Sequence, residues 1–173
     1  MPRLFASDDD QDLVRAERDV SAAFVNLDLD LRSLLAVSNI FRAATAVRNH
    51  MEHDVLAEQE LSWSAFTTLF VLRVWGDMDA RSLAAEAGVS AATLTGVMKT
   101  LESRGLIRRK SDRADGRRVV VTLTSAGHHV VDSVMPAFNR HERLVTQALT
   151  EDEQESLARS LRTILRTVEA IDL

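Results

Sequence analysis

Two helical segments joined by a very short connection constrain this chain more than any other feature. The first spans residues 79–87, and the second begins at Ser90, directly after Gly88 and Val89. Asp79 and Ser90 are side chains of the kind that cap helix N-termini, and Gly88 can adopt the positive φ that ends a helix. Because the connection is so short, the two helices must meet at a sharp angle, as they do in a helix-turn-helix.

The second of these helices has two different faces. Apolar side chains recur at the helical spacing i, i+3, i+4 and i+7 and predict a face toward the core: Leu94, Val97, Met98 and Leu101. The opposite face has small or polar side chains and one cation: Ala92, Thr95, Gly96, Lys99 and Ser103. Small side chains allow a helix to approach base edges in a major groove. An ordinary solvated face would have the same composition, so this helix alone favours the solvated interpretation.

The segment after Gly105 predicts a β-hairpin with a basic tip. Two strands, at 106–110 and 118–123, flank a turn-rich stretch that ends in Asp-Gly. Seven cations lie between positions 104 and 118: Arg104, Arg108, Arg109, Lys110, Arg113, Arg117 and Arg118. The carboxylates of Asp112 and Asp115 offset them in part. Arginine at the tip of a thin hairpin can enter a minor groove or bind phosphates, and Asp115 is expected to orient Arg117 by pairing with it.

Together, these segments resemble the MarR-type (multiple antibiotic resistance regulator) winged-helix transcription factors. The resemblance is carried by residues 83–109, 112–118 and 121–127. The Asp-x-Arg motif of the family's wing falls on Asp115 and Arg117, with Gly116 where the family often has a basic residue. The family's Leu-Thr-x-x-Gly motif falls on Leu123, Thr124 and Gly127. The resemblance implies a mainly α fold with a small β-hairpin wing, in which N- and C-terminal helices form a dimerisation region.

The resemblance also implies a function. Each subunit of a homodimer would place residues 91–103 in a major groove of double-stranded DNA and the wing, 112–118, beside a minor groove. The residues expected to contact DNA are Ser90, Thr93, Thr95, Lys99, Arg113, Asp115 and Arg117. We therefore expect a sequence-specific transcriptional regulator, a ligand-responsive repressor, that binds a pseudo-palindromic operator. The alternative is a winged-helix module that contacts other proteins without specific DNA binding.

The distribution of charge agrees with a polyanionic partner. The whole chain is acidic, with a net charge of −5. Residues 62–125 nevertheless hold ten cations and six acids, whereas residues 1–61 hold six and twelve, and residues 126–173 hold five and eight. Such asymmetry directs one region toward DNA and keeps the rest away from it.

The remaining segments predict helices on both sides of the helix-turn-helix and hairpin at 79–123. Residues 1–10 form a polar tail that we expect to be disordered. Residues 11–61 and 124–173 form the expected dimerisation region, and 62–123 the DNA-binding region. Within these, helices are predicted at 11–26, 31–57, 63–75, 124–149 and 151–171, the last preceded by a Thr-x-x-Glu capping box. The helix at 11–26 is additional to the minimal family pattern.

One cation on an apolar stripe suggests a ligand site. Arg48 interrupts the apolar side of helix 31–57, and Trp63, Phe66 and Phe70 form an aromatic side of the next helix. The simpler interpretation is that Arg48 reaches solvent or a carboxylate, and that the aromatic residues are core. If the four residues meet, they form an apolar cleft with one charge, which suits a small aromatic acid.

Other classes of function lack support in the sequence. There is no cysteine, and no nucleophile elbow, glycine-rich phosphate loop or recognisable pair of catalytic carboxylates, so we expect neither an enzyme nor a cofactor. His50 and His53 are one helical turn apart, but they lack a closed ligand pattern, and no metal is expected. No apolar run predicts a signal peptide or a membrane span, so a cytoplasmic location is expected.

Overall fold

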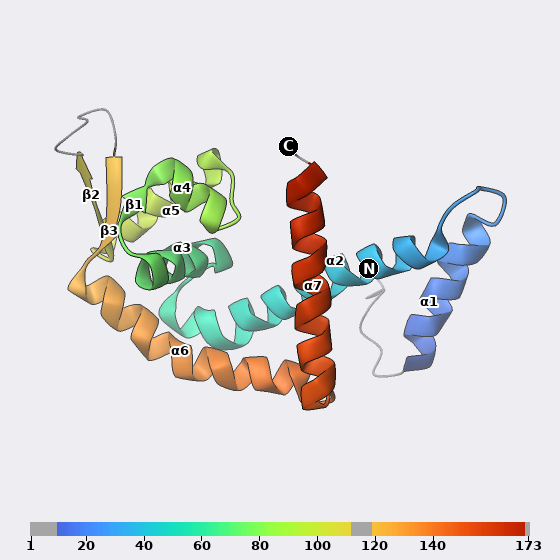
Figure 1. Ribbon diagram of the computed structural model, residues 1–173. Coiled ribbons are helices and arrows are strands. Elements are labelled where there is room, and N and C mark those ends of the chain that lie inside the picture. Colours follow the sequence, from blue (N-terminus) through green and yellow to red (C-terminus); the bar gives the residue numbers. More distant parts are fainter. Residues whose placement is uncertain (1–9, 112–118, 172–173) are drawn as a thin grey trace. The chain divides into compact units, whose positions relative to one another are not determined.

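The computed structural model describes residues 10–111 and 119–171, which divide into two compact units, the first ending at His50 and the second beginning at Met51. The tip of the wing, 112–118, lies outside the described residues, and with it Arg113, Asp115 and Arg117. The described part is mainly helical with one small sheet, as predicted (Figure 1). Within it, no helix combines the length and the apolar character needed to cross a membrane.

The first unit contains a helix pair. It consists of α1 (Asp10–Ala23) and α2 (Leu31–Met51). Asp30 caps α2, because its Oδ1 accepts hydrogen bonds from the backbone N–H groups of Arg32 and Ser33, at 3.1 and 3.3 Å. Asn39 Nδ2 on α2 donates to Glu17 Oε1 on α1 over 2.8 Å. The additional N-terminal helix therefore exists, and a side-chain hydrogen bond joins it to α2.

The helix predicted at 31–57 changes its character part-way. After Met51 the chain forms a π-helical turn, η1 (Glu52–Leu56), and then a 3₁₀ turn, η2 (Ala57–Gln59). Glu60 ends this segment with a φ of 50°, and its N–H donates to the Ala57 carbonyl oxygen. Val55 and Leu56 are both buried, although they are consecutive. The prediction of one regular helix to residue 57 was therefore wrong from position 52 onward.

The core of the second unit is built on α3 (Trp63–Trp75), which has the predicted bounds. The Ser62 hydroxyl accepts from the Ala65 N–H over 3.2 Å and so caps the helix. Its buried residues are Ala65, Phe66, Thr68, Leu69, Val71 and Leu72. The helix contacts α4, α5, α6 and β3 and is therefore central to this unit. The single polar member, Thr68, donates its hydroxyl to the Ser64 carbonyl oxygen.

A helix-turn-helix and a three-stranded sheet complete the winged-helix part. The helices are α4 (Ala80–Glu86) and α5 (Ala91–Ser103), and Gly88 between them has a φ of 65°. The strands are β1 (Met78–Asp79), β2 (Ile107–Ser111) and β3 (Val119–Leu123), in the order β1-β3-β2 and antiparallel (Figure 1). The sequence predicted only the hairpin, because a two-residue strand has no alternation to recognise.

Two long helices end the chain. α6 (Ser125–Thr146) continues through Pro136 and is linked to α3 by Arg73 Nε and Asp132 Oδ1, which are 2.9 Å apart. α7 (Glu151–Ile171) begins at the predicted capping box, where Thr150 and Glu153 bond each other's backbone N–H groups.

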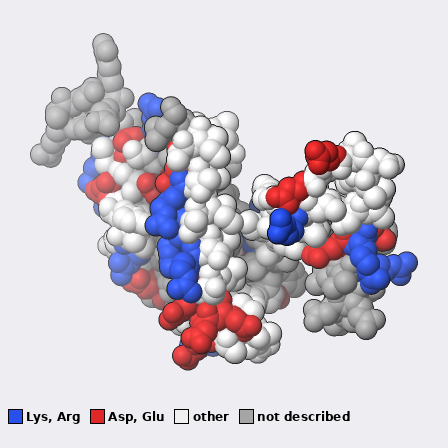
Figure 2. Space-filling model, turned by 45° about the vertical axis from the view of Figure 1, so that its right-hand side comes forward, with Lys and Arg blue, Asp and Glu red and all other residues white. Residues whose placement is uncertain are grey.

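α7 leaves its apolar stripe uncovered within one chain. Its large apolar side chains are 40–75% exposed: Leu157, Ile164, Leu165, Val168 and Ile171. Figure 2 shows α7 with a band of basic surface beside uncharged surface and with acids at its N-terminal end. Those acids are favourable there because of the helix dipole. A helix this amphipathic has an apolar face that its own chain does not bury.

Candidate nucleic-acid interface

α5 and its cap carry four of the predicted contact residues. Ser90 Oγ accepts from the Thr93 N–H over 3.1 Å and so holds the helix N-terminus, as predicted. Thr93, Thr95 and Lys99 are all exposed. Of the predicted core face, Leu94, Met98 and Leu101 are buried, and Val97 is half-buried. Four of the seven predicted DNA contacts are therefore exposed on α5 or at its cap, and the other three lie outside the described residues.

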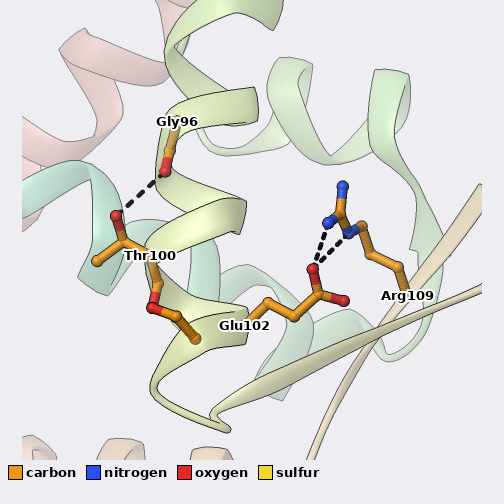
Figure 3. A network of polar contacts seen from close by, with 5 residues as sticks. Gly96, Thr100, Glu102 and Arg109 are labelled. Atoms are coloured by element: carbon orange, nitrogen blue, oxygen red, sulfur yellow. Dashed lines mark hydrogen bonds and ion pairs between the residues drawn. The ribbon is translucent and has the colours of Figure 1, made fainter.

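The C-terminal end of α5 is tied to the wing by an ion pair that sequence reasoning missed. Glu102 Oε2 accepts from Arg109 Nε over 2.9 Å and also from Arg109 Nη2 (Figure 3). The hydrogen bond from Arg109 lowers the pKa of the Glu102 carboxyl below its usual value, and the same contact raises the pKa of Arg109. The pair joins α5 to β2, so it holds the C-terminal end of α5 against the first strand of the wing.

This ion pair gives a prediction for the pH dependence of stability. The folded-state pKa of Glu102 is lowered, so the pair stabilises the protein above the unfolded-state pKa of about 4.3 and this contribution is lost as the pH falls through the folded-state value. Glu102→Gln should therefore be less stable than the parent at pH 7, with a difference that shrinks toward pH 3.5. Urea midpoints at both pH values measure it. Glu155→Gln, on an exposed site of α7, is the control, and a pH-independent deficit in Glu102→Gln would contradict the prediction.

Arg104, immediately after α5, also has partners within the chain. Its Nη1 and Nη2 donate to the backbone carbonyl oxygens of Glu60 and Gln59, both over 2.8 Å. The sequence placed Arg104 and Arg109 among seven cations around the wing. All four side chains, those of Arg104, Arg108, Arg109 and Lys110, are exposed. Arg104 and Arg109 differ in that hydrogen bonds to acceptors within the chain hold their guanidinium groups.

The base of the wing is joined to α6 through Thr124 and Gly127. The Thr124 N–H donates to the Leu106 carbonyl oxygen over 3.0 Å. The Thr124 hydroxyl donates to the Gly105 carbonyl oxygen over 2.6 Å. The same hydroxyl accepts from the Gly127 N–H over 3.0 Å and caps α6. Gly127 packs so closely that an added Cβ would lie 2.1 Å from the Leu106 oxygen. The Leu-Thr-x-x-Gly motif thus closes the wing onto the helix that follows it.

The aromatic residues proposed for a ligand site form a cluster with a member that the sequence did not reveal. Phe138 of α6 stacks on Phe66 with ring centroids 4.7 Å apart and lies 6.1 Å from the Trp63 ring. The Phe66 and Phe70 rings are 6.0 Å apart. Arg48 is exposed and belongs to the first unit, whereas the cluster belongs to the second. The site that would combine them therefore remains a prediction.

His53 contacts the carboxylate of its neighbour in the chain. His53 Nδ1 lies 2.8 Å from Asp54 Oδ1, and both side chains are exposed. Over residues 10–111 and 119–171, no three His, Cys, Asp or Glu side chains are grouped as a metal ion would require.

Comparison with known proteins decides the family. The MarR family model matches residues 61–119, which cover α3, the helix-turn-helix, β1 and β2 and end at the first residue of β3. A Bacillus subtilis protein, the uncharacterized HTH-type transcriptional regulator YwaE, is 34% identical over 157 residues, which are 89% of this chain and 92% of that protein. The chain belongs to the MarR family. This MarR-family protein is therefore a DNA-binding transcriptional regulator, from a family of regulators rather than enzymes.

Two further relatives bear on its function. The transcriptional repressor NicR of Pseudomonas putida is 26% identical, over 75% of this MarR-family chain and 82% of its own length. The solved structure of BpsR from Bordetella bronchiseptica superposes with a TM-score of 0.68 at 25% identity, over 75% of this chain and 98% of that one. DNA binding by BpsR is regulated by 6-hydroxynicotinic acid.

Proposed function

We propose that this MarR-family regulator is a homodimeric repressor that binds a pseudo-palindromic operator and releases it when a small aromatic acid binds. The observation that carries the DNA-binding half is the exposed face of α5, where Thr93, Thr95 and Lys99 surround small side chains beside a capped N-terminus. A helix N-terminus with free N–H groups and a serine hydroxyl also suits a phosphate. Repression is supported by the likeness to NicR, which is named a repressor.

In this proposal the contacts divide between two grooves. Ser90, Thr93, Thr95 and Lys99 contact bases or phosphates in the major groove, and the wing residues Arg113, Asp115 and Arg117 act at the adjacent minor groove. A twofold dimer then reads half-sites about one helical turn (~10 bp) apart. Residues 62–123 serve as the DNA-binding region, and residues 11–61 with 124–173 serve as the dimerisation region. The exposed apolar stripe of α7 supports the second assignment.

Lys99 provides a test of which groove atoms α5 reads. Lys99→Ala should weaken operator binding by about 1–3 kcal/mol, and relax one base position, if the ammonium group donates to a guanine. If it binds a phosphate instead, the affinity should fall equally for all sequences, and the salt slope should decrease by about 0.9. A footprinting titration at several salt concentrations separates the two outcomes. An unchanged affinity would remove Lys99 from the interface.

The effector is expected to be an aromatic acid that pairs with Arg48 and stacks on the cluster of Trp63, Phe66 and Phe70. Support comes from the regulation of BpsR by 6-hydroxynicotinic acid and from the aromatic contacts of the cluster. Titration with 6-hydroxynicotinate or salicylate should change the tryptophan fluorescence saturably, and Arg48→Ala should weaken the binding about tenfold, since the cation that pairs with the carboxylate of the ligand is lost. Flat titrations of both proteins would contradict the effector proposal.

Selection of bound sequences from a random duplex pool tests the central claim. A sequence-specific dimer should enrich an inverted repeat, and the enriched site should compete in a mobility shift far better than a scrambled duplex. A winged-helix module that serves only for protein contacts would enrich no sequence. That result would refute the proposed repressor while leaving the fold unaffected.

A further inference from the structure

The C-terminal end of α5 is hydrogen-bonded to a segment near the start of the second unit. Arg104 follows α5, and its guanidinium donates to the carbonyl oxygens of Gln59 and Glu60, each over 2.8 Å. Gln59 is the last residue of η2, and Glu60 comes directly after it. The fixed fork of N–H groups in arginine can bridge two neighbouring oxygens, which the single ammonium group of a lysine does less well.

The receiving turn has an unusual backbone. Glu60 has a φ of 50°, and among residues 10–111 and 119–171 it is the one non-glycine residue with a positive φ. Such a conformation is unfavourable for a residue with a Cβ and persists only where neighbouring groups hold it. Arg104 is one of these groups, because it contacts the carbonyl oxygen of Glu60 itself.

The same segment is also held to α3. Glu52 Oε1 accepts from the Trp63 N–H over 2.6 Å, and the side chains of Val55 and Leu56 are buried. Segment 52–60 is therefore attached to α3 at one end and to the end of α5 at the other. The segment begins just after the boundary between the two units. It consists of a π-helical turn followed by a 3₁₀ turn. Irregular helical turns of this kind often mark functional hinges.

We propose that Arg104 is a positioning residue for DNA recognition. It couples the position of α5 to that of segment 52–60 and so sets the orientation in which α5 enters the major groove. The inference rests on the proposed placement of α5 in that groove. It assigns Arg104 a role different from that of a phosphate contact, because both ends of its guanidinium already donate to carbonyl oxygens within the chain.

Two substitutions separate positioning from phosphate binding. Arg104→Met removes both the fork and the charge, whereas Arg104→Lys removes the fork and keeps the charge. Each purified full-length protein is titrated against the duplex that the parent selects and against a scrambled duplex, at several salt concentrations. We expect the ratio of the two affinities to fall about tenfold in both variants, the size of effect that loss of charged hydrogen bonds allows. Arg104→Lys should retain the parent's scrambled-duplex affinity and salt slope.

A different pattern would overturn the proposal. A phosphate contact predicts that Arg104→Lys behaves like the parent, and that Arg104→Met loses affinity for both duplexes equally with a salt slope smaller by about 0.9. Hydrogen exchange adds a second readout: the Glu60 and Leu61 amides, which bond Ala57 and Leu56, should exchange faster in both variants. Parent-like exchange at these amides would also refute the coupling.

Controls keep the two proposals distinct. Arg18→Met makes the same chemical change at an exposed site on α1 and should leave the affinity ratio unchanged. Circular dichroism checks that each variant is folded, and Arg104→Lys provides the comparison should Arg104→Met lose its helical signal. A parent that selects no sequence would refute the repressor and this inference together. A parent with a preferred duplex, and variants that keep its ratio, would refute only the role of Arg104.

Discussion

Replacing Gly127 with alanine should lower the free energy of unfolding by about 3 kcal/mol, the upper part of the range for overpacked sites. The added Cβ would lie 2.1 Å from the Leu106 carbonyl oxygen and 2.9 Å from Leu123 Cδ2. The first obstacle is a backbone atom, which cannot rotate away as a side chain can. The wing base and the first turn of α6 must therefore separate. Urea denaturation measures the change, and the thermal midpoint should fall by roughly 6–12 °C.

Gly96 is the matched control for this substitution. It lies inside α5, and an added Cβ there meets nothing within 4 Å. Gly96→Ala should raise the stability by up to about 1 kcal/mol, because alanine is the better helix former. The two identical chemical changes are thus expected to have opposite signs. If the free energy of unfolding of Gly127→Ala lies within about 0.5 kcal/mol of the parent's value, as it does for a typical surface substitution, the backbone at Leu106 can move away and the prediction is wrong.

Leu165→Asp on α7 should separate the proposed homodimer into single chains. Leu165 is 62% exposed within one chain, and it lies on the apolar stripe with Leu161 and Val168. A carboxylate buried against a partner's apolar surface would be unpaired, which costs several kcal/mol, so the dimer dissociation constant should rise more than 100-fold. Operator affinity should fall with it, since a single chain reads only one half-site.

Sedimentation velocity measures the dissociation, and a mobility shift measures the loss of operator binding. Thr163→Asp adds the same charge to an exposed position on another side of α7 and should leave the dimer intact. Single chains of the parent itself, at micromolar concentration, would contradict the proposed dimer. A dimeric Leu165→Asp variant would place the dimer interface elsewhere.

The N-terminal boundaries of α3, α4, α5 and α6 followed from local chemistry. Ser62, Asp79, Ser90 and Thr124 each cap a helix by accepting a backbone N–H within the next three residues. Such contacts depend only on residues adjacent in the chain, so the sequence contains all the information they need. The buried face of α5 was predicted for the same reason, since a period of 3.6 residues places its apolar side chains on one side.

The omissions involve contacts between residues that are distant in the sequence. β1 forms only because β3 lies beside it, pairing Met78 with Val121. The partners of Arg104 are more than forty positions away, and no spacing rule connects them. Phe138 joins the aromatic cluster from α6, a helix that starts after the wing. Each of these contacts requires the elements to be placed in space first.

The sequence by itself determined the likeness to the MarR family, the capping residues of the helices and the buried face of α5, because caps, periodicity and motif spacing act over a few residues. Only the tertiary structure decided how the cations around the wing are used. Arg109 donates to Glu102 and Arg104 donates to the turn at the end of η2, although both side chains are as exposed as those of Arg108 and Lys110. The charge of an arginine is fixed by its chemistry, but its partner is fixed by whichever acceptor the folded chain brings within hydrogen-bonding distance.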